Sequence, residues 1–330
     1  MIISKTPFRI SFFGGGTDYP VWFEKYGGAV LSTTIDKYCY INIRYLPPFF
    51  EHKHRIVYSI VENVKSSNEI KHPVVKSLLE YFKIDKGVEI HHDGDLPARS
   101  GLGSSSSFTV GMLNSLYALN GKMISKGQLA REAIHIERNV LKENVGSQDQ
   151  IAAAHGGFNK IVFHNDHNFR VEAITLQKEK IDQLQSHLML IFTGFSRFAS
   201  KIAVEQIRNT PNKRKELNVM RHMVDEAIDI LNSDRDIGEF GKLLDETWQV
   251  KKRLSSKISN PEVDRLYKNA LKNGAIGGKL LGAGGGGFML LFVRPENRKK
   301  VSRVLKDFLE VKFNFENDGS QIIYYNPQEV

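Results

Sequence analysis

The sequence has few of the features that mark secreted, metal-bound or membrane proteins. Its 330 residues include one cysteine, Cys39, so neither an internal disulfide nor a zinc site built from cysteines can form. Its longest apolar stretches, such as Leu188–Phe192 and Phe288–Val293, are far shorter than the roughly 18 to 20 residues that cross a bilayer. Lys5 and Arg9 interrupt the apolar N-terminus, and no signal-peptide pattern follows. We therefore expect a cytoplasmic protein with no membrane association.

Basic residues outnumber acidic ones, 46 to 37, which gives a formal net charge of +9. This balance favours anionic partners such as nucleic acid, acidic lipid or phosphorylated small molecules. The basic residues are scattered, however, and short clusters such as residues 251–253 fall in helical patterns, where we expect a solvated face. Because no nucleic-acid-binding motif accompanies them, we expect no nucleic-acid partner.

Strand and helix patterns alternate along the chain, which predicts an α+β fold. Strands are predicted at residues 2–4, 10–13, 29–34, 38–45, 55–59, 88–91, 158–163 and 171–175. Helices are predicted from Pro73, over Ser104–Leu119, and from Ser125, whose spacing to Gln128 fits a capping box. A second region contains a strand at residues 188–193, three or four amphipathic helices, strands at residues 275–281 and 288–293, a helix near residues 298–308 and two closing strands. We predict two domains, residues 1–175 and 176–330.

A glycine- and serine-rich segment, residues 97–107, stands directly before the helical pattern of Ser104–Leu119. The free N–H groups and the positive dipole of a helix start make an anion site, and serine hydroxyls can ligate Mg²⁺ or cap the helix. A flexible linker explains the segment poorly, because apolar periodicity begins immediately afterwards. The segment is therefore predicted to be a phosphate-binding loop.

Two other glycine-rich segments lie towards the two ends of the chain. Residues 14–18, Gly-Gly-Gly-Thr-Asp, would let a ligand approach the backbone closely while presenting one carboxylate, although a strand ending in a glycine turn is the simpler alternative. Residues 277–287 contain the Gly-x-Gly-x-x-Gly spacing, but an apolar strand follows where a dinucleotide site needs a helix. This excludes a Rossmann site. No segment has Walker A spacing or the motifs of a protein kinase.

Two acidic residues stand out between these segments. Glu137 falls on the apolar face of the helix predicted from Ser125, where a carboxylate is costly unless it is paired or bound to a cation. We interpret it as a Mg²⁺ ligand, with a salt bridge to a core arginine or lysine as the alternative. Asp149 stands at a helix start, which suits a proton acceptor or an electrostatic anchor. The alternative for Asp149 is an ordinary N-terminal cap.

Together, the three glycine-rich segments resemble the motifs of the GHMP family of small-molecule kinases, named for galacto-, homoserine, mevalonate and phosphomevalonate kinases. Residues 7–19 resemble the substrate motif, residues 97–107 the phosphate loop and residues 277–287 the C-terminal glycine motif. One such motif is only suggestive, but the ordered trio is specific and extends over nearly the whole chain. The resemblance implies a GHMP kinase fold: an N-terminal unit like the second domain of ribosomal protein S5, a C-terminal GHMP α+β domain, and an active site between them.

The resemblance also implies roles for individual residues, with ATP and Mg²⁺ as cofactors. Asp149 matches the presumed base, Arg9 matches the motif arginine beside it, and Ser105 and Glu137 match the Mg²⁺ ligands. The ATP-binding residues would be the phosphate loop and the glycines that support it: Gly101, Leu102, Gly103, Ser104, Ser105, Ser106, Gly284 and Gly285. The substrate sugar would be bound by the loop after the first motif strand: Gly15, Gly16, Thr17 and Asp18.

Departures from the galactokinase pattern narrow the expected substrate. Galactokinases carry Gly-Glu-His where this chain has Gly14-Gly15-Gly16, so two side chains that contact sugar hydroxyls are absent and the pocket should be roomier. These glycines, the Gln-Asp-Gln segment around Asp149 and residues 193–197 are most similar to the family members that phosphorylate D-glycero-D-manno-heptose 7-phosphate on its anomeric hydroxyl. The implied product is the 1,7-bisphosphate used to make nucleotide-activated heptose.

The phosphate that such a substrate already carries would need a positive charge of its own. Arg197, close to a predicted helix start, is our prediction for this role, with a solvated arginine on the first helical turn as the alternative. Two other functions stay open: a 1-kinase of an unphosphorylated sugar such as fucose, and a sugar-sensing protein that kept the fold and lost catalysis. The joint presence of Asp149, Glu137, Ser105 and Arg9 argues against the sensor.

Overall fold

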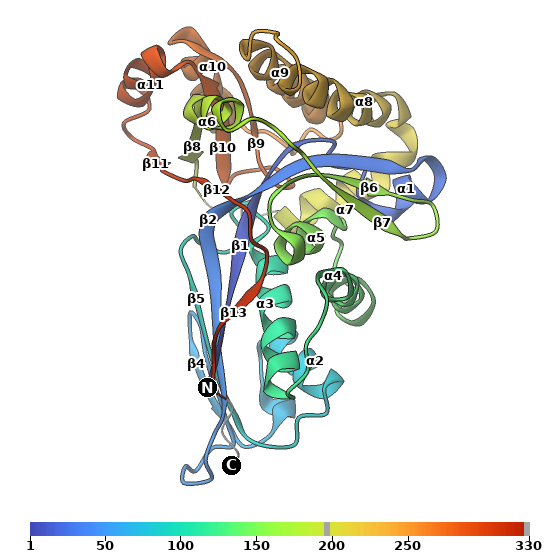
Figure 1. The fold of residues 1–330 in the computed structure, drawn as a ribbon, viewed down its shortest axis with the longest axis vertical. Coiled ribbons are helices and arrows are strands. Elements are labelled where there is room, and N and C mark those ends of the chain that lie inside the picture. Colours follow the sequence, from blue (N-terminus) through green and yellow to red (C-terminus); the bar gives the residue numbers. More distant parts are fainter. Residues whose placement is uncertain (195–198, 327–330) are drawn as a thin grey trace.

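A computed structural model describes residues 1–194 and 199–326, and this part of the chain forms two β-sheets with helices packed against them (Figure 1). The larger sheet has nine strands and contains the order β13–β1–β2–β5–β3–β4; β6 and β12 also pair with β2, and β7 pairs with β6. The smaller sheet has the order β11–β8–β10–β9. We call the two parts the N-terminal unit and the C-terminal unit. This mixed architecture confirms the predicted α+β class.

The N-terminal unit is built from the larger sheet and the helices beside it. Its strands are β1 (Ile2–Phe13), β2 (Gly28–Tyr45), β3 (His54–Val57), β4 (Val61–Val64), β5 (Val88–Gly94), β6 (Phe158–Phe163), β7 (Phe169–Ala173), β12 (Phe315–Glu316) and β13 (Gln321–Tyr325). Its helices are α1 (Pro20–Tyr26), α2 (Pro73–Tyr81), α3 (Ser104–Leu119), α4 (Lys126–His135) and α5 (Gln148–His155). Between α4 and α5 runs a π-helical turn, Ile136–Val140.

The C-terminal unit contains the smaller sheet and the remaining helices. Its strands are β8 (Leu188–Phe192), β9 (Ala275–Leu280), β10 (Phe288–Val293) and β11 (Leu309–Val311). Its helices are α6 (Lys178–His187), α7 (Ala199–Asn209), α8 (Arg214–Leu231), α9 (Gly238–Lys252), α10 (Pro261–Lys272) and α11 (Arg298–Val304). Nowhere in the described residues is a helix both long and apolar enough to span a membrane.

The end of the chain returns to the N-terminal unit. The sequence predicted two closing strands, whereas the structure has three, of which β11 joins the smaller sheet. The other two, β12 and β13, pair with β2 and β1 of the larger sheet, and Figure 1 shows β13 beside β1. The domain division at residue 175 stays a prediction, but β12 and β13, which follow it in the sequence, belong to the sheet of the N-terminal unit.

Two predicted strand pairs are each one long strand in the structure. Residues 2–4 and 10–13 belong to β1, and residues 29–34 and 38–45 belong to β2. Their register shifts where Pro7 pairs with Tyr38 and Phe8 pairs with Ile35. Such a bulge tolerates a proline, which cannot donate to the ladder, and it bends the strands. As a result, one half of β2 pairs with β5 and the other half pairs with β6.

The helix starts follow the predicted local signals. Pro73 is the first residue of α2, and Ser125 caps α4 by accepting a hydrogen bond from the N–H of Gln128 at 3.2 Å. Gly103, with φ near 76°, immediately precedes α3. The phosphate loop before α3 packs against β1, where the Arg9 N–H donates to the Leu102 carbonyl at 3.0 Å.

An aromatic cluster joins the N-terminal and C-terminal units at the end of β1. Phe12 and Phe13, at the end of β1, make edge-to-face contacts with Phe240 of α9, with ring centroids 5.6 and 5.1 Å apart. All three rings are completely buried. Edge-to-face pairs add to the free energy gained from burial, so this cluster fixes β1 against the C-terminal unit.

Gly156 offers a test of how the C-terminal segment packs. It has φ near 71°, and a Cβ there would lie 2.0 Å from the carbonyl carbon of Asp318, in the β12–β13 connection. We expect Gly156→Ala to lower the free energy of unfolding by about 3 kcal/mol or more, because backbone strain adds to a backbone collision. Urea denaturation followed by circular dichroism measures this loss.

Gly121 provides the matched control. It also has a left-handed φ, near 66°, but a Cβ there would meet nothing within 4 Å. Gly121→Ala should therefore cost only the strain of the backbone conformation, about 1 to 2 kcal/mol. Equal losses for the two variants would show that the β12–β13 connection does not press on Gly156.

Candidate active site

A cavity of about 570 Å³ lies where β1 ends, and residues of both units line it. Its wall includes the glycine loop after β1, the start of α3 and the start of α5 from the N-terminal unit. Side chains of α7, α8 and α9 and the end of β9 complete it from the C-terminal unit. All three glycine-rich segments of the sequence therefore meet at one cavity.

The phosphate loop forms the side of the cavity at the start of α3. Gly101 and Gly103 have φ angles of 86° and 76°, which favour glycine. Leu102 between them is fully buried, and its carbonyl accepts a hydrogen bond from the Arg9 N–H at 3.0 Å. The other predicted ATP-binding residues of the loop line the cavity: Gly101, Gly103, Ser104, Ser105 and Ser106. The first N–H groups of a helix lack intrahelical partners, so this wall is suited to phosphate oxygens.

The third glycine-rich segment supports this loop from the C-terminal unit. A Cβ on Gly282 would lie 2.5 Å from Gly101 Cα, and one on Gly287 would lie 2.3 Å from the Ser100 carbonyl oxygen. Two backbones can approach this closely only where side chains are absent. Gly282 and Gly287 therefore hold the phosphate loop in place.

Gly284 and Gly285, which the family resemblance assigned to ATP binding, pack against Ile258 and are not among the residues that line the cavity. A Cβ on Gly284 would lie 2.8 Å from Ile258 Cα, and the Gly285 N–H donates to the Ile258 carbonyl at 2.9 Å. The residues of this loop that line the cavity are instead Gly282 and Ala283. Because all four belong to the same motif, the sequence located the loop but not the residues that contact the cavity.

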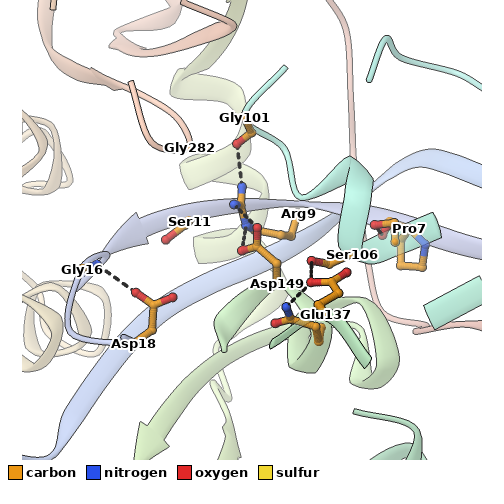
Figure 2. A network of polar contacts seen from close by, with 12 residues as sticks. Pro7, Arg9, Ser11, Gly16, Asp18, Gly101, Ser106, Glu137, Asp149 and Gly282 are labelled. Atoms are coloured by element: carbon orange, nitrogen blue, oxygen red, sulfur yellow. Dashed lines mark hydrogen bonds and ion pairs between the residues drawn. The ribbon is translucent and has the colours of Figure 1, made fainter. Parts of the chain in front are cut away.

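Arg9 and Asp149 form a bidentate ion pair in the cavity wall (Figure 2). Arg9 Nε and Nη2 donate to Oδ1 and Oδ2 of Asp149, each at 2.8 Å, and Nη1 donates to the Gly101 carbonyl at 2.7 Å. Arg9 is 3% exposed, whereas the Asp149 side chain is about a quarter exposed and borders the cavity. This pairing matches the planar donor geometry of arginine. It fixes the orientation of the Asp149 carboxylate in the cavity wall.

Asp18 lies on the other side of Asp149 from the metal-ligand candidates, as Figure 2 shows. It is 2% exposed, and its Oδ1 accepts a hydrogen bond from the Gly16 N–H at 2.9 Å. Burial, reinforced by the negative charge of Asp149, raises the pKa of Asp18. A Cβ on Gly146 would lie 1.8 Å from Asp18 Oδ2, so only glycine fits there.

The predicted substrate-binding loop divides into cavity-lining and structural residues. Gly15, Gly16 and Asp18 line the cavity. Thr17 is fully buried, and its hydroxyl lies 2.8 Å from the Gly14 carbonyl and 2.9 Å from the Ala29 carbonyl. Thr17 therefore holds the glycine loop against the start of β2.

Glu137 lies on the π-helical turn after α4 and is completely buried. Its Oε2 accepts hydrogen bonds from the Ser106 hydroxyl at 2.9 Å and from the Gln150 amide, while Oε1 has no hydrogen-bond partner among the described residues. Burial raises the pKa of Glu137 to about 7, although interactions with the side chains of Thr109, Gln150 and Ser106 oppose the change. The salt bridge considered as an alternative is not found in the described part of the chain.

The serine bonded to Glu137 is Ser106, one residue after the predicted metal ligand Ser105. Ser105 is exposed in the cavity on the first turn of α3, and Ser106 is buried. An unpaired buried carboxylate oxygen is costly, and carboxylate oxygens are common ligands of Mg²⁺. The Oε1 oxygen of Glu137 and the serine hydroxyls at the start of α3 are therefore donors of the kind that suits a magnesium ion.

Lys251 is buried in the cavity wall, contrary to the solvated face expected for residues 251–253. It is 7% exposed, and its Nζ donates to the carbonyls of Leu280 at 2.9 Å and Gly282 at 2.6 Å. Burial, together with the charge of Arg9, lowers the pKa of Lys251 to about 7. The helical pattern does not reveal this, because the C-terminal glycine loop covers the end of α9.

Lys279 is a second buried lysine, and it was not among the residues predicted from the sequence. It lies on β9, is 3% exposed, and donates to the carbonyls of Ser11 at 2.9 Å and Phe12 at 2.7 Å. Burial, with the neighbouring charges of Lys251 and Arg9, lowers the pKa of Lys279 strongly. The sequence did contain a signal for it: a lysine within a strand predicted to be buried needs hydrogen-bond acceptors for its ammonium group.

The structure thus gathers Arg9, Asp149 and Asp18 on one wall and the phosphate loop beside them. Arg197, predicted to bind the phosphate of the substrate, lies outside the described residues. Its role stays a prediction.

Comparisons with known proteins agree with this geometry. The family model of the GHMP kinase N-terminal domain matches residues 68–157, and that of the GHMP kinase C-terminal domain matches residues 224–311. The D-glycero-alpha-D-manno-heptose 7-phosphate kinase of Campylobacter jejuni is 31% identical, over 92% of this chain and 93% of that enzyme. The bifunctional fucokinase/GDP-fucose pyrophosphorylase of Arabidopsis thaliana is 24% identical, over 91% of this chain and 30% of that protein.

A solved structure gives the same result for the fold. The D-glycero-D-manno-heptose 1-phosphate kinase from Bacteroides thetaiotaomicron has a TM-score of 0.78 and 26% identity, covering 98% of this chain and 99% of that one. The chain belongs to the GHMP kinases, and the predicted GHMP kinase fold is confirmed. Within that family it is an ATP-dependent carbohydrate kinase, as the sequence predicted.

The raised pKa of Glu137 predicts a pH dependence of stability in the absence of divalent metal ions. Between the ordinary value of 4.5 and the folded value of about 7, the folded state holds a proton that the unfolded state has lost. The stability that this group contributes is therefore full below pH 4.5 and is lost as the pH rises to about 7.

Glu137→Gln imitates the protonated form and should remove this dependence. The wild type should lose about 2 to 3 kcal/mol of unfolding free energy relative to Glu137→Gln between pH 4.5 and pH 7.5. Urea titrations of both proteins in the presence of EDTA measure the difference. Parallel stability curves over this range would show that Glu137 titrates at its ordinary pKa.

Proposed function

We propose that this kinase transfers the γ-phosphoryl group of ATP to the anomeric hydroxyl of D-glycero-D-manno-heptose 7-phosphate, giving the 1,7-bisphosphate. One observation carries the proposal: the Arg9–Asp149 pair borders the cavity between the phosphate loop and Asp18. The name of the Campylobacter relative, at 31% identity, supports this choice of substrate. The product would serve the synthesis of nucleotide-activated heptose.

Asp149 acts as the proton acceptor in this scheme. As the anomeric oxygen attacks the γ-phosphorus, its proton passes to the Asp149 carboxylate and the bond to the β-phosphate oxygen breaks, which releases ADP. Arg9 holds the carboxylate through both oxygens. Phosphoryl transfer depends mostly on positioning and charge stabilisation, so the rigid Arg9–Asp149 pair suits the reaction.

The two substrates approach from different walls of the cavity. Gly101, Gly103 and Ser104 line it at the start of α3, where backbone N–H groups suit ATP phosphates. Gly15, Gly16 and Asp18 line it after β1 and would bind sugar hydroxyls. The missing side chains at the glycines leave room for a seven-carbon sugar. Arg197 is proposed as one contact to its phosphate.

Glu137 and Ser105 are proposed to hold Mg²⁺, with Ser106 orienting the Glu137 carboxylate. The buried Oε1 of Glu137, which has no partner among the described residues, is the observation that supports this site. When bound, Mg²⁺ supplies positive charge to the β- and γ-phosphate oxygens. The hydrogen bonds from Ser106 and Gln150 hold Glu137 in place for that contact.

One experiment tests the substrate. ADP release is measured with hexoses and heptoses, each with and without a terminal phosphate. The proposal expects the highest kcat/KM for D-glycero-D-manno-heptose 7-phosphate. A preference for fucose or another unphosphorylated sugar would favour a fucokinase-like activity, and sugar binding without ADP release would favour a sensor.

Asp149→Asn tests the proton acceptor. We expect kcat to fall at least 10²-fold with nearly unchanged ATP affinity, because general bases contribute about 10²- to 10⁴-fold. Steady-state kinetics and calorimetric ATP titration measure the two quantities. A variant that keeps more than about a tenth of the wild-type kcat would remove Asp149 from the base role.

Glu137→Gln and Ser105→Ala test the metal site. Both should raise the Mg²⁺ concentration needed for half-maximal activity, since Mg²⁺ is usually held by one or two protein oxygens and the ATP phosphates. Ser106→Ala serves as the comparison, because Ser106 already donates to Glu137. If only Ser106→Ala changes the Mg²⁺ requirement, Ser106 replaces Ser105 as the ligand; an unchanged requirement in Glu137→Gln refutes the site.

A further inference from the structure

Two buried ammonium groups in the cavity wall have no part in the steps above. We propose that Lys251 and Lys279, together with the Ser11 hydroxyl, form a subsite that binds the phosphate already present on the sugar. The subsite would thereby select phosphorylated over unphosphorylated substrates. This inference rests on the proposed function and adds the residues that read the substrate.

Each lysine has a donor to spare. An ammonium carries three N–H groups, and the structure gives Lys251 and Lys279 two protein acceptors each, all of them backbone carbonyls. These bonds hold the two Nζ atoms in place, and both residues line the cavity. When each lysine is protonated, its third N–H has no acceptor among the described residues. That N–H is available to an anion, whose charge also favours the protonated form.

The Ser11 hydroxyl is an independent sign of a ligand. Ser11 is 5% exposed and lines the cavity, yet its Oγ has no hydrogen-bond partner among the described residues. A buried polar atom without a partner is costly unless a ligand satisfies it. Its own carbonyl accepts the hydrogen bond from Lys279, so the hydroxyl and the ammonium belong to the same corner of the cavity.

The charges of this corner favour an anion. Asp149 is already paired with Arg9, and Asp18 is the carboxylate whose charge acts on both lysines. Two ammonium groups thus face one buried carboxylate. Burial and mutual repulsion destabilise their charged forms, and a phosphate dianion supplies the missing negative charge.

The position of this corner fits the distal phosphate of the sugar better than the γ-phosphoryl group. The contacts along β1 come in order. The Pro7 carbonyl accepts a hydrogen bond from the Ser107 hydroxyl of α3. Arg9 lies two residues further along, and the Lys279 ammonium binds the carbonyls of Ser11 and Phe12 beyond it. Figure 2 shows Ser11 on the opposite side of Arg9 from Ser106 and Glu137. Two to three residues of extended strand span about 7 to 10 Å, and the phosphate of a heptose 7-phosphate lies at the far end from its anomeric hydroxyl.

The test compares Ser11→Ala, Lys251→Gln and Lys279→Gln with the wild type. KM and kcat are measured for D-glycero-D-manno-heptose 7-phosphate, for the unphosphorylated heptose and for ATP. Charge-assisted hydrogen bonds predict that KM for the 7-phosphate rises about ten- to a hundredfold. KM for ATP, and KM for the unphosphorylated heptose, should stay within about twofold of the wild type. Calorimetric titration of the 7-phosphate without ATP should show the same loss of affinity.

Two variants keep the test interpretable. Ser11→Ala removes a hydroxyl that makes no hydrogen bond in the described structure, so it decides the question even if a buried lysine variant fails to fold. Lys252→Gln removes the next lysine on α9, whose Nζ lies 3.9 Å from Asp264 at the surface. This control should leave every kinetic constant unchanged.

The outcomes separate the two proposals. A wild type that does not prefer the 7-phosphate refutes the proposed substrate, and the phosphate-reading subsite with it. If the wild type prefers it but the variants lose equally on both heptoses, only the subsite is refuted. Loss of kcat with a raised KM for ATP would assign the lysines to the transferring phosphoryl group, which also overturns the inference.

Discussion

The ion pair between Arg9 and Asp149 is the interaction on which the site depends. All three side-chain nitrogens of Arg9 donate hydrogen bonds, two to Asp149 and one to the Gly101 carbonyl. A single guanidinium therefore ties the middle of β1 to the start of α5 and to the phosphate loop. Removing one partner would leave a buried charge unpaired, which costs about 3 to 5 kcal/mol. Asp149 and the phosphate loop are consequently held in one geometry by the same group.

The glycines follow from that geometry, because the three segments meet backbone to backbone. A Cβ on Gly103 would lie 3.2 Å from Arg9 Cγ, and one on Gly282 would lie 2.5 Å from Gly101 Cα. The motif glycines thus serve less as flexible hinges than as positions of close contact: a side chain at Gly103 would push the phosphate loop away from β1, and one at Gly282 would push it away from the C-terminal unit. Lys251, which donates to the Gly282 carbonyl, holds this contact from the other side. The phosphate loop is therefore fixed by elements of both units.

Local signals in the sequence predicted local structure well. The start of α3, the Ser125 cap of α4 and the limits of β6 follow from capping residues, periodicity and flanking glycines. The continuity of β1 and the return of β12 and β13 were not predictable, since they depend on pairing between residues far apart in the chain. For the same reason, the buried state of Lys251 was missed. The roles that the family resemblance implies for Arg9, Asp149 and Glu137 stay predictions.

The electrostatics of the cavity link the binding of a charged ligand to the protonation of buried groups. Without ligands, burial raises the pKa of Asp18 and lowers that of Lys251 to about 7, so both groups are destabilised in their charged forms. A bound anion beside the lysine reverses its shift, since an opposite charge favours the protonated ammonium. By linkage, an anion that favours the protonated lysine would also stabilise the folded enzyme. Under the proposal above, the sugar phosphate would be that anion, and the unfavourable charge of that corner of the cavity would favour a phosphorylated ligand.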